Sequence, residues 1–480
     1  MDRKSLKLLG VFPAVLTAGC LYTEPGYEQA AILASESLPD FTNEWEELQE
    51  QVDGEPIGWI EALEDPVLLA FVEEAESNNF DLRATLATVE RFRAAVGLDE
   101  AALYPAIDGN ADFSSNGAIN QQRDIQTIGG GISAAWEIDL WGRLLSAKQS
   151  AIADFESAAA DYRFSRYVLA ATVATAYFDA VAAALQEDVA RGTYDALRET
   201  TRVVELRFEN GAANAEDVAL TRTDLATQLD ALLEAEGSKR DAYRTLAVLV
   251  GRYPTSQMDI RNTQPSVPTP PPAGLPAQLL ERRPDIIASK LAISSAVDNL
   301  DSSRAAKFPA LTISGSFDAQ EPTGSGVFAG FNDGSWIWNF VGGFTQPIFD
   351  AGALDAQEEI AIADLDSAVA TYGAVVLDAF NDVELALDQT RVLRHRQDAL
   401  ADAAAEAQRA LDVSKLRYRE GETDILDVLE IEQRLFNAQS NLVLIERDQL
   451  ANYISLALAL GGDWRAVKAE LDEASAPDQG

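Results

Sequence analysis

The sequence predicts a mixed α and β fold, in which long antiparallel coiled-coil hairpins of helices accompany four β-strands. Three observations predict it. The chain is internally duplicated, it contains helical stretches far longer than a globular domain uses, and it has two pairs of alternating segments with one apolar face. Each repeat is expected to supply one hairpin and two strands, and the strands are expected to contribute to a transmembrane barrel shared between chains.

The duplication is clearest in two twelve-residue segments, 151–162 and 361–372. Eight of their twelve positions are identical at an offset of 210. The same offset maps Gly211 onto Gly421, and it persists over about a hundred residues. Internal repeats decide architecture, and these two are long units rather than the short modules of a solenoid.

The helical stretches are identified by what they lack and by their period. Residues 143–209 contain no proline, and Gly192 is their only glycine. At 1.5 Å per residue such a helix is about 100 Å long. The returning helices carry apolar residues in heptad register, which predicts coiled-coil seams. These residues are Val218, Leu225, Leu232 and Leu246, with Val428, Leu435, Leu442 and Leu456 in the second repeat. Gly211 and Gly421 mark the hairpin tips.

Two pairs of segments alternate apolar and polar residues with the period of a strand. They cover 105–115 and 128–140 in the first repeat, and 309–319 and 335–348 in the second. Trp and Phe near the strand ends fit the aromatic girdle of a membrane barrel. An ordinary soluble hairpin is the alternative. Strands of about ten residues with a polar opposite face favour the barrel.

The boundaries of the parts follow from the repeats and from a proline-rich linker. The expected order is a signal peptide (1–19), an N-terminal lipid-anchored segment (20–64), repeat 1 (65–251), the linker (252–276), repeat 2 (277–461) and a C-terminal tail (462–480).

The N-terminus has the layout of a secretory signal, because positive residues precede a short apolar stretch. Residues 16–20 read LTAGC and resemble a bacterial lipobox, in which the Cys20 thiol takes a diacylglycerol. A chance match is the alternative, but Cys20 is the only cysteine in the chain. Leu21 follows it, whereas lipoproteins kept at the inner membrane usually have Asp there. The expected location is the outer membrane, with the chain extending into the periplasm.

Composition excludes several classes of protein. The chain has 37 Lys and Arg against 78 Asp and Glu, a formal net charge of −41. Binding of nucleic acid needs clustered positive charge, so it is not expected. One cysteine and one histidine, His395, predict no disulfide, no metal site and no cofactor. No nucleophile motif or phosphate-binding loop points to an enzyme.

Four strands cannot close a membrane barrel. Single-chain bacterial barrels start at about eight strands, and open edges cannot sit in lipid because their backbone groups would be unpaired. At least two chains must therefore share one barrel. A wide lumen lined by polar residues would need more than two.

Three motifs carry a resemblance to a known family. Residues 275–286 read LPAQLLERRPDI, residues 136–143 read WEIDLWGR, and 416–418 read LRY before Gly421. Together they resemble the TolC/OprM outer membrane factor family, and within it the NodT-type lipoproteins of tripartite efflux systems. The resemblance covers nearly the whole mature chain.

The resemblance implies a homotrimer with a twelve-stranded barrel in outer membrane lipid and a helical tunnel below it. It also implies a periplasmic adaptor protein and an inner-membrane pump, often of the resistance-nodulation-division type. The chain would then be a passive conduit for small molecules such as drugs and toxic solutes. A conduit for type I protein secretion, metal efflux, and a pore-free coiled-coil lipoprotein are the alternatives.

The resemblance also points to a periplasmic gate. Asp427 and Glu430 are three residues apart, so they share one helix face. They fall where the family has acidic rings, and a trimer would place six carboxylates around a narrow pore. Rings of this kind select cations and bind polyvalent cations that block flow. The alternative is two solvated acidic residues on a very acidic protein.

The hairpin tips carry the remaining expectations. Tyr418 and Asp217 resemble members of the tip latch that holds neighbouring helices together. The chain departs from better-studied members at Thr423, where they have Arg, so its latch must differ in part. Adaptors in the family touch the tip turns, which makes Gly211 and Gly421 the candidate docking points.

Overall fold

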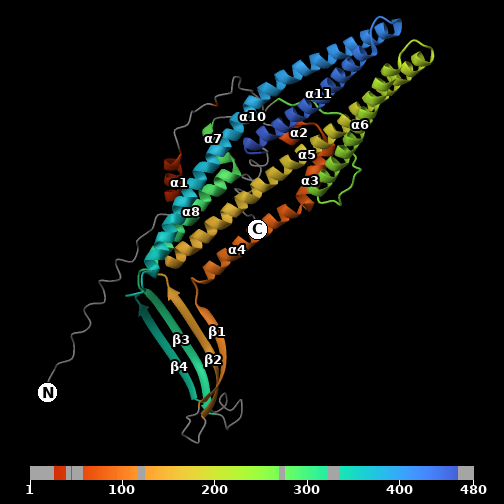
Figure 1. The fold of residues 1–480 in the computed structure, drawn as a ribbon. Coiled ribbons are helices and arrows are strands. Elements are labelled where there is room, and N and C mark those ends of the chain that lie inside the picture. The colour runs from red at the N-terminus through yellow and green to blue at the C-terminus, as the bar shows by residue number, and fades with distance from the viewer. Residues whose placement is uncertain are drawn as a thin grey trace, which may run out of the picture. The chain divides into compact units, whose positions relative to one another are not determined.

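The computed structural model describes residues 26–38, 45, 58–116, 125–269, 276–322 and 335–462. Within them, groups of helices and pairs of strands alternate along the chain, and the four strands form one sheet (Figure 1). The helices of the first half are α1 (Gly26–Ser37), α2 (Trp59–Ala62), α3 (Pro66–Asn78), α4 (Phe80–Ala101), α5 (Arg143–Glu209) and α6 (Ala215–Leu249). Those of the second half are α7 (Pro276–Arg282), α8 (Pro284–Ala305), α10 (Ala353–Glu420) and α11 (Ile425–Ala459). The strands are β1 (Ala106–Asn116), β2 (Ile125–Ile138), β3 (Ala310–Pro322) and β4 (Ser335–Thr345).

The chain forms two compact units, and α5 and α10 each run from one unit into the other. The strand unit holds all four strands, and the hairpin unit holds the α5–α6 and α10–α11 hairpin tips. The strand unit lies within residues 1–39, 87–160 and 287–375, and the hairpin unit within 40–86, 161–286 and 376–480.

The sheet is antiparallel throughout, in the order β1-β2-β3-β4. Its register places Ile107 opposite Ala134, and Phe317 opposite Trp338. Because side chains alternate along a strand, these residues share one apolar face. Asp108, Ser133 and their neighbours in register lie on the other face, which is polar. The predicted four strands with one apolar face are confirmed, and β1 and β4 are the edges of the described sheet.

Two glycines of β2 lie beneath carboxylates of the neighbouring strands. Gly131 is opposite Asp318 of β3, and Gly129 is opposite Asp112 of β1. A Cβ at Gly131 would lie 2.6 Å from the Phe317 carbonyl oxygen and 2.8 Å from the Asp318 Cα atom. These neighbours are backbone atoms, so no side-chain rotation can relieve the clash. Glycine at 131 therefore permits close pairing of β2 and β3.

The connection from β2 to α5 ties the two repeats together within the strand unit. The Trp141 indole N–H donates to the Pro309 carbonyl oxygen at 2.8 Å, and its ring stacks on Phe308 with centroids 5.2 Å apart. Arg143 forms an ion pair with Glu137 at 2.8 Å, which fixes the first turn of α5 against the end of β2. Phe308 and Pro309 of the second repeat thus contact the β2–α5 connection of the first.

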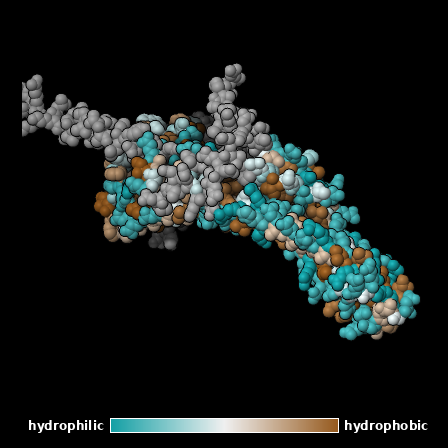
Figure 2. Space-filling view, turned by 90° about the horizontal axis from the view of Figure 1, so that it is seen from above, coloured by the Kyte–Doolittle hydropathy of each residue, from teal (hydrophilic) through white to brown (hydrophobic). Residues whose placement is uncertain are grey.

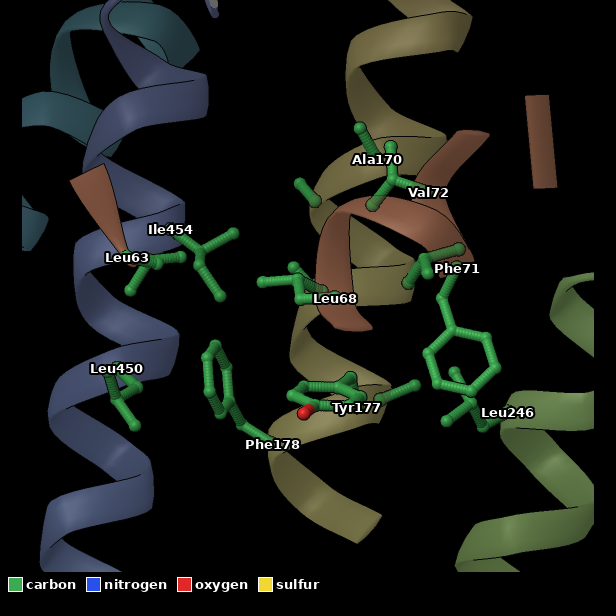
Figure 3. Close-up of a cluster of buried hydrophobic side chains, with 14 of the residues drawn as sticks. Leu63, Leu68, Phe71, Val72, Ala170, Tyr177, Phe178, Leu246, Leu450 and Ile454 are labelled. Carbon is green, nitrogen blue, oxygen red and sulfur yellow. The ribbon is translucent and has the colours of Figure 1, made fainter. Parts of the chain in front are cut away.

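The hairpin unit has an apolar core where α2, α3, α5, α6 and α11 meet, part of which Figure 3 shows. Phe71 of α3 and Tyr177 of α5 lie with ring centroids 5.9 Å apart, and Tyr177 meets Phe178 edge to face at 5.3 Å. The other helices contribute Leu246 from α6 and Ile454 from α11. Burial of such large apolar side chains contributes about 1.5–3 kcal/mol each.

One carboxylate organises the polar side of this core. Asp65 caps α3 by accepting from the Val67 and Leu68 backbone N–H groups at 3.0 and 3.2 Å. Its Oδ2 atom accepts from the Tyr177 hydroxyl at 3.0 Å and from the Arg261 guanidinium at 3.1 Å. Burial raises the pKa of Tyr177, and the Asp65 charge raises it further, so Tyr177 keeps its proton and remains a donor.

We expect Gly131→Ala to destabilise the sheet by roughly 1–3 kcal/mol, because an added methyl group forces the backbones of β2 and β3 apart. Gly109→Ala is the matched control, since a Cβ there meets nothing within 4 Å. Thermal unfolding followed by tryptophan fluorescence measures both. Equal midpoints for the two variants would contradict the close-approach argument.

We expect Asp65→Ala to lower the free energy of unfolding by roughly 2–4 kcal/mol, because it removes a helix cap and leaves the Arg261 charge and Tyr177 hydroxyl without their acceptor. Asp65→Asn keeps an oxygen that can cap α3 and loses only the charge, so its effect should be smaller. Denaturant unfolding of the two variants separates the contributions. An Asn variant as unstable as the Ala variant would show that the charge outweighs the cap.

Candidate functional site

Both hairpins end in the same turn. Gly211 and Gly421 have φ values of +72° and +79°, the left-handed conformation that only glycine adopts without strain. Each tip has paired backbone hydrogen bonds of the Schellman type, which satisfy the last carbonyl groups of the helix. The backbone N–H group of the first residue donates to the carbonyl oxygen of the second in each of these pairs: Gly211 and Phe208 (3.0 Å), Ala212 and Arg207 (2.8 Å), Gly421 and Tyr418 (3.1 Å), and Glu422 and Arg417 (2.9 Å).

The tips present an open surface. A Cβ at Gly211 or Gly421 would meet no atom of the described chain within 4 Å. The two glycines are therefore required by the turn and not by close packing inside the chain. Their role as adaptor docking points stays a prediction, and the structure gives both tips the same backbone shape for it.

The predicted gate carboxylates lie on the first turns of α11. Asp427 and Glu430 are both exposed, while Val428 and Leu429 between them are buried. Asp427 accepts a hydrogen bond from the Thr423 hydroxyl, and Glu430 pairs with Arg434 at 3.2 Å. The helix therefore presents the two carboxylates on its exposed face, as the spacing predicts. Their role as a gate stays a prediction.

The predicted latch residues lie near one another but form separate interactions. Tyr418 is buried, and among the described residues its hydroxyl has no hydrogen-bond partner. Asp217 instead closes a capping box at the start of α6, where it and Asn214 each accept from the other's backbone N–H. Burial raises the pKa of Tyr418, Asp217 and Asp424 raise it further, and Arg207 opposes them.

The partner that the structure gives Tyr418 is Arg207 of α5. The guanidinium lies 4.5 Å from the centre of the Tyr418 ring and also donates to the Tyr418 carbonyl oxygen. The two hairpins are therefore joined at their tips by one cation–π contact and one hydrogen bond. Sequence reasoning missed this role, although Arg207 stands at the repeat position of Arg417.

A second polar group, which sequence reasoning also missed, joins three helices further from the tips. Glu432 of α11 is 7% exposed and accepts from Lys415 of α10 at 2.7 Å and from Thr200 of α5 at 3.1 Å. It lies beside an apolar cluster formed by the same helices, which includes Leu197, Val204, Leu411, Ile425 and Leu435.

Two expectations remain, a lipidation site at Cys20 and the absence of a metal site. Cys20, the expected lipidation site, lies outside the described residues. Among the residues that the structure does describe, no three His, Cys, Asp or Glu side chains come together as ligands for a metal ion.

The sequence matches a known family twice. The model of the outer membrane efflux protein family matches residues 71–252 and 275–462, one match for each repeat. The chain is 30% identical over 425 residues to a pyoverdine export outer membrane protein, OpmQ, of Pseudomonas putida, covering 85% of this chain and 88% of the relative. It is 26% identical over 476 residues to SilC of Salmonella typhimurium, a probable outer membrane lipoprotein. The match covers 96% of this chain and 99% of SilC.

Solved structures share the fold over most of the chain. The CmeC outer membrane channel of Campylobacter jejuni superposes with a TM-score of 0.81, covering 91% of this chain and 96% of that one. Sequence identity to it is 24%, so this likeness speaks to fold alone.

Removal of Arg207 should loosen the tips. Arg207→Ala deletes a cation–π contact and a hydrogen bond that join the hairpins, which are together worth about 1–3 kcal/mol. We therefore expect thermolysin to cleave near the tips roughly tenfold faster. Arg417→Ala, at the equivalent repeat position, is the control, because the ion pair of Arg417 is with exposed Glu422 at 3.7 Å and contributes little. If both variants are cleaved at the same rate, Arg207 does not join the hairpins.

Proposed function

The chain belongs to the outer membrane efflux protein family, and we propose that three copies of it form a gated tunnel that passes small molecules out of the periplasm. It is the outer membrane channel component of a tripartite efflux system. The family is one of conduits and not a class of enzymes. The trimer, the gate, the cargo and the docking points are the proposed parts.

The open sheet is the observation that carries this proposal. Each chain contributes four antiparallel strands with one apolar face, and β1 and β4 are left as edges of the described sheet. In hydrocarbon every backbone N–H and C=O group needs a partner, so β1 of one copy must pair with β4 of the next. Three copies give a closed barrel with its apolar face toward lipid and its polar face toward the lumen.

Exposed apolar surface on the long helices supports the same assembly. α10 contains an 18-residue stretch that is long and apolar enough to cross a membrane by composition, yet only 17% of it is buried. Figure 2 shows apolar residues scattered among hydrophilic ones on the face that it draws. In the proposed trimer, α10 packs against a second copy, which removes part of this apolar stretch from water.

The proposed gate is made by α11. Asp427 and Glu430 lie on the exposed face of its first turns, so three copies can bring six carboxylates around one axis. Closely spaced carboxylates attract cations, and polyvalent cations most strongly. The gate would therefore favour cations when open and be blocked by trivalent ions.

The remaining partners follow from the family and from the sequence. Channels of this family are trimers that work with periplasmic adaptors and inner-membrane pumps. We propose that the adaptor binds the tip turns at Gly211 and Gly421, and that the pump is of the resistance-nodulation-division type. The lipobox supports acylation of Cys20 and an outer membrane anchor, and SilC is likewise a probable outer membrane lipoprotein.

Single-channel conductance in planar bilayers tests the tunnel and the gate together. We expect small, cation-selective openings that hexaamminecobalt(III) blocks from the periplasmic side. In Asp427→Ala/Glu430→Ala the block should weaken by roughly tenfold or more, because the carboxylates that attract the trivalent ion are gone. Glu422→Gln is the matched control, since Glu422 is an exposed carboxylate of the same tip.

The outcomes separate the parts of the proposal. If hexaamminecobalt(III) still blocks the double variant, the constriction lies elsewhere, and the proposed tunnel is not contradicted. Protein that is monomeric and gives no channels contradicts the shared barrel, and the pore-free coiled-coil lipoprotein then becomes the better reading.

A further inference from the structure

α5 carries a heptad pattern with one apolar and one polar position. The apolar position holds small or branched residues, which are buried or half-buried, and the polar position lies three residues further on. The apolar residues are Ala176, Ala183, Ala190, Leu197 and Val204. The polar residues are Asp179, Gln186, Thr193, Thr200 and Arg207. In an ordinary coiled coil both positions are apolar, so an entirely polar position needs an explanation.

Four of the five polar residues contact the second hairpin. Asp179 pairs with Arg447 at 2.8 Å, and Gln186 exchanges two 2.7 Å hydrogen bonds with Ser440. Thr200 donates to Glu432 at 3.1 Å, and Arg207 donates to the Tyr418 carbonyl oxygen. We call these contacts the polar ladder. The ladder runs along α5 at seven-residue intervals and joins the α5–α6 hairpin to the α10–α11 hairpin.

Thr193 marks the position where the ladder is interrupted. Its hydroxyl donates to the Val189 carbonyl oxygen of its own helix at 2.9 Å. Beside it lies a cavity of about 610 Å³, and Gly192 adds to the free space because a Cβ there meets nothing within 4 Å. The helices are thus less closely packed at this level, and Glu432 and Lys415 also line this cavity.

Glu432 is the most buried acid of the ladder and the one with partners on both hairpins. Its Oε1 atom accepts from Lys415 at 2.7 Å and from Thr200 at 3.1 Å, while its Oε2 atom is buried without a partner among the described residues. An ionised carboxylate only accepts, so Thr200 is the donor. The Thr200 hydroxyl also lies 3.1 Å from the Ala196 carbonyl oxygen, so one proton serves two acceptors.

A buried polar residue in a coiled-coil seam fixes register, because any sliding separates it from its partner and leaves it unsatisfied. We propose that Glu432 is the positioning residue that sets the axial register between the two hairpins of each chain, and that it does so through Thr200. Its consequence for the gate rests on the proposed function. Glu430 and Asp427 lie two and five residues before Glu432 on the same helix, so this register also positions the gate carboxylates.

A pair of neighbouring threonines gives the test its control. Thr200 bonds across to the second hairpin, whereas Thr201 bonds within the first, to the Leu197 carbonyl oxygen at 2.9 Å and the Thr221 carbonyl oxygen at 3.3 Å. Thr200→Val and Thr201→Val remove the same hydroxyl from adjacent positions. Thr200→Ser keeps the donor, and Lys415→Gln removes the charge that accompanies Glu432.

The readout is the rate at which a maleimide labels Val204→Cys in the purified full chain, with Cys20→Ser so that no other thiol can react. Val204 is fully buried in the apolar cluster between the hairpins, so a thiol there reacts only when they part. We expect Thr200→Val to raise the labelling rate about tenfold, since it deletes a hydrogen bond to a charged group. Lys415→Gln should act in the same direction. The labelling rates of Thr201→Val and Thr200→Ser should stay close to that of Val204→Cys alone.

Conductance of the same variants separates the two proposals. With the register set by Glu432, Thr200→Val raises the open probability of the channel and Thr201→Val does not. Equal labelling rates for Thr200→Val and Thr201→Val would overturn the inference even where every variant conducts. If labelling separates the two variants but no protein conducts, the positioning role of Glu432 stands and the proposed function fails.

Discussion

Backbone pairing at the two edges of the four-stranded sheet is the constraint on which the rest of the structure depends. A chain with β1 and β4 as edges and one apolar face cannot be stable alone in lipid, because its edge N–H and C=O groups would have no partners. In the proposed assembly, the edge strands of further copies supply these partners. The proposed assembly then depends on the backbone, and the proposed gate depends on the side chains.

The duplication repeated the backbone and let the side chains diverge. Gly211, Gly251, Gly421 and Gly461 all have positive φ, so both repeats end their helices in the same way. Arg207 and Arg417 stand at equivalent tip positions, yet Arg207 contacts the ring of Tyr418 while Arg417 meets an exposed glutamate. One hairpin therefore provides the tip cation and the other provides the aromatic acceptor, and the contact joins the two repeats.

Local periodicity made most of the fold predictable, because strand alternation and heptad spacing depend only on neighbours in sequence. The pairings across the hairpins were not predictable in this way. The latch role of Tyr418 and Asp217 rests on a resemblance and stays a prediction, and only the structure shows that the Asp217 carboxylate closes the capping box of α6. Glu432 went unnoticed because one acid among 78 acidic residues carries no signal until its burial is known.

Mixed chemistry in the seam between the hairpins suits the proposed gated tunnel, whose helices would have to separate on opening. Leu197 and Val204 bury apolar surface and hold the hairpins together, while Thr200 and Arg207 make bonds that water can replace when the helices separate. A seam with two apolar positions would expose more hydrocarbon on opening, at about 25 cal/mol for each Å². The polar contacts lower that cost and still define a single closed register, because only one alignment brings Thr200 to Glu432.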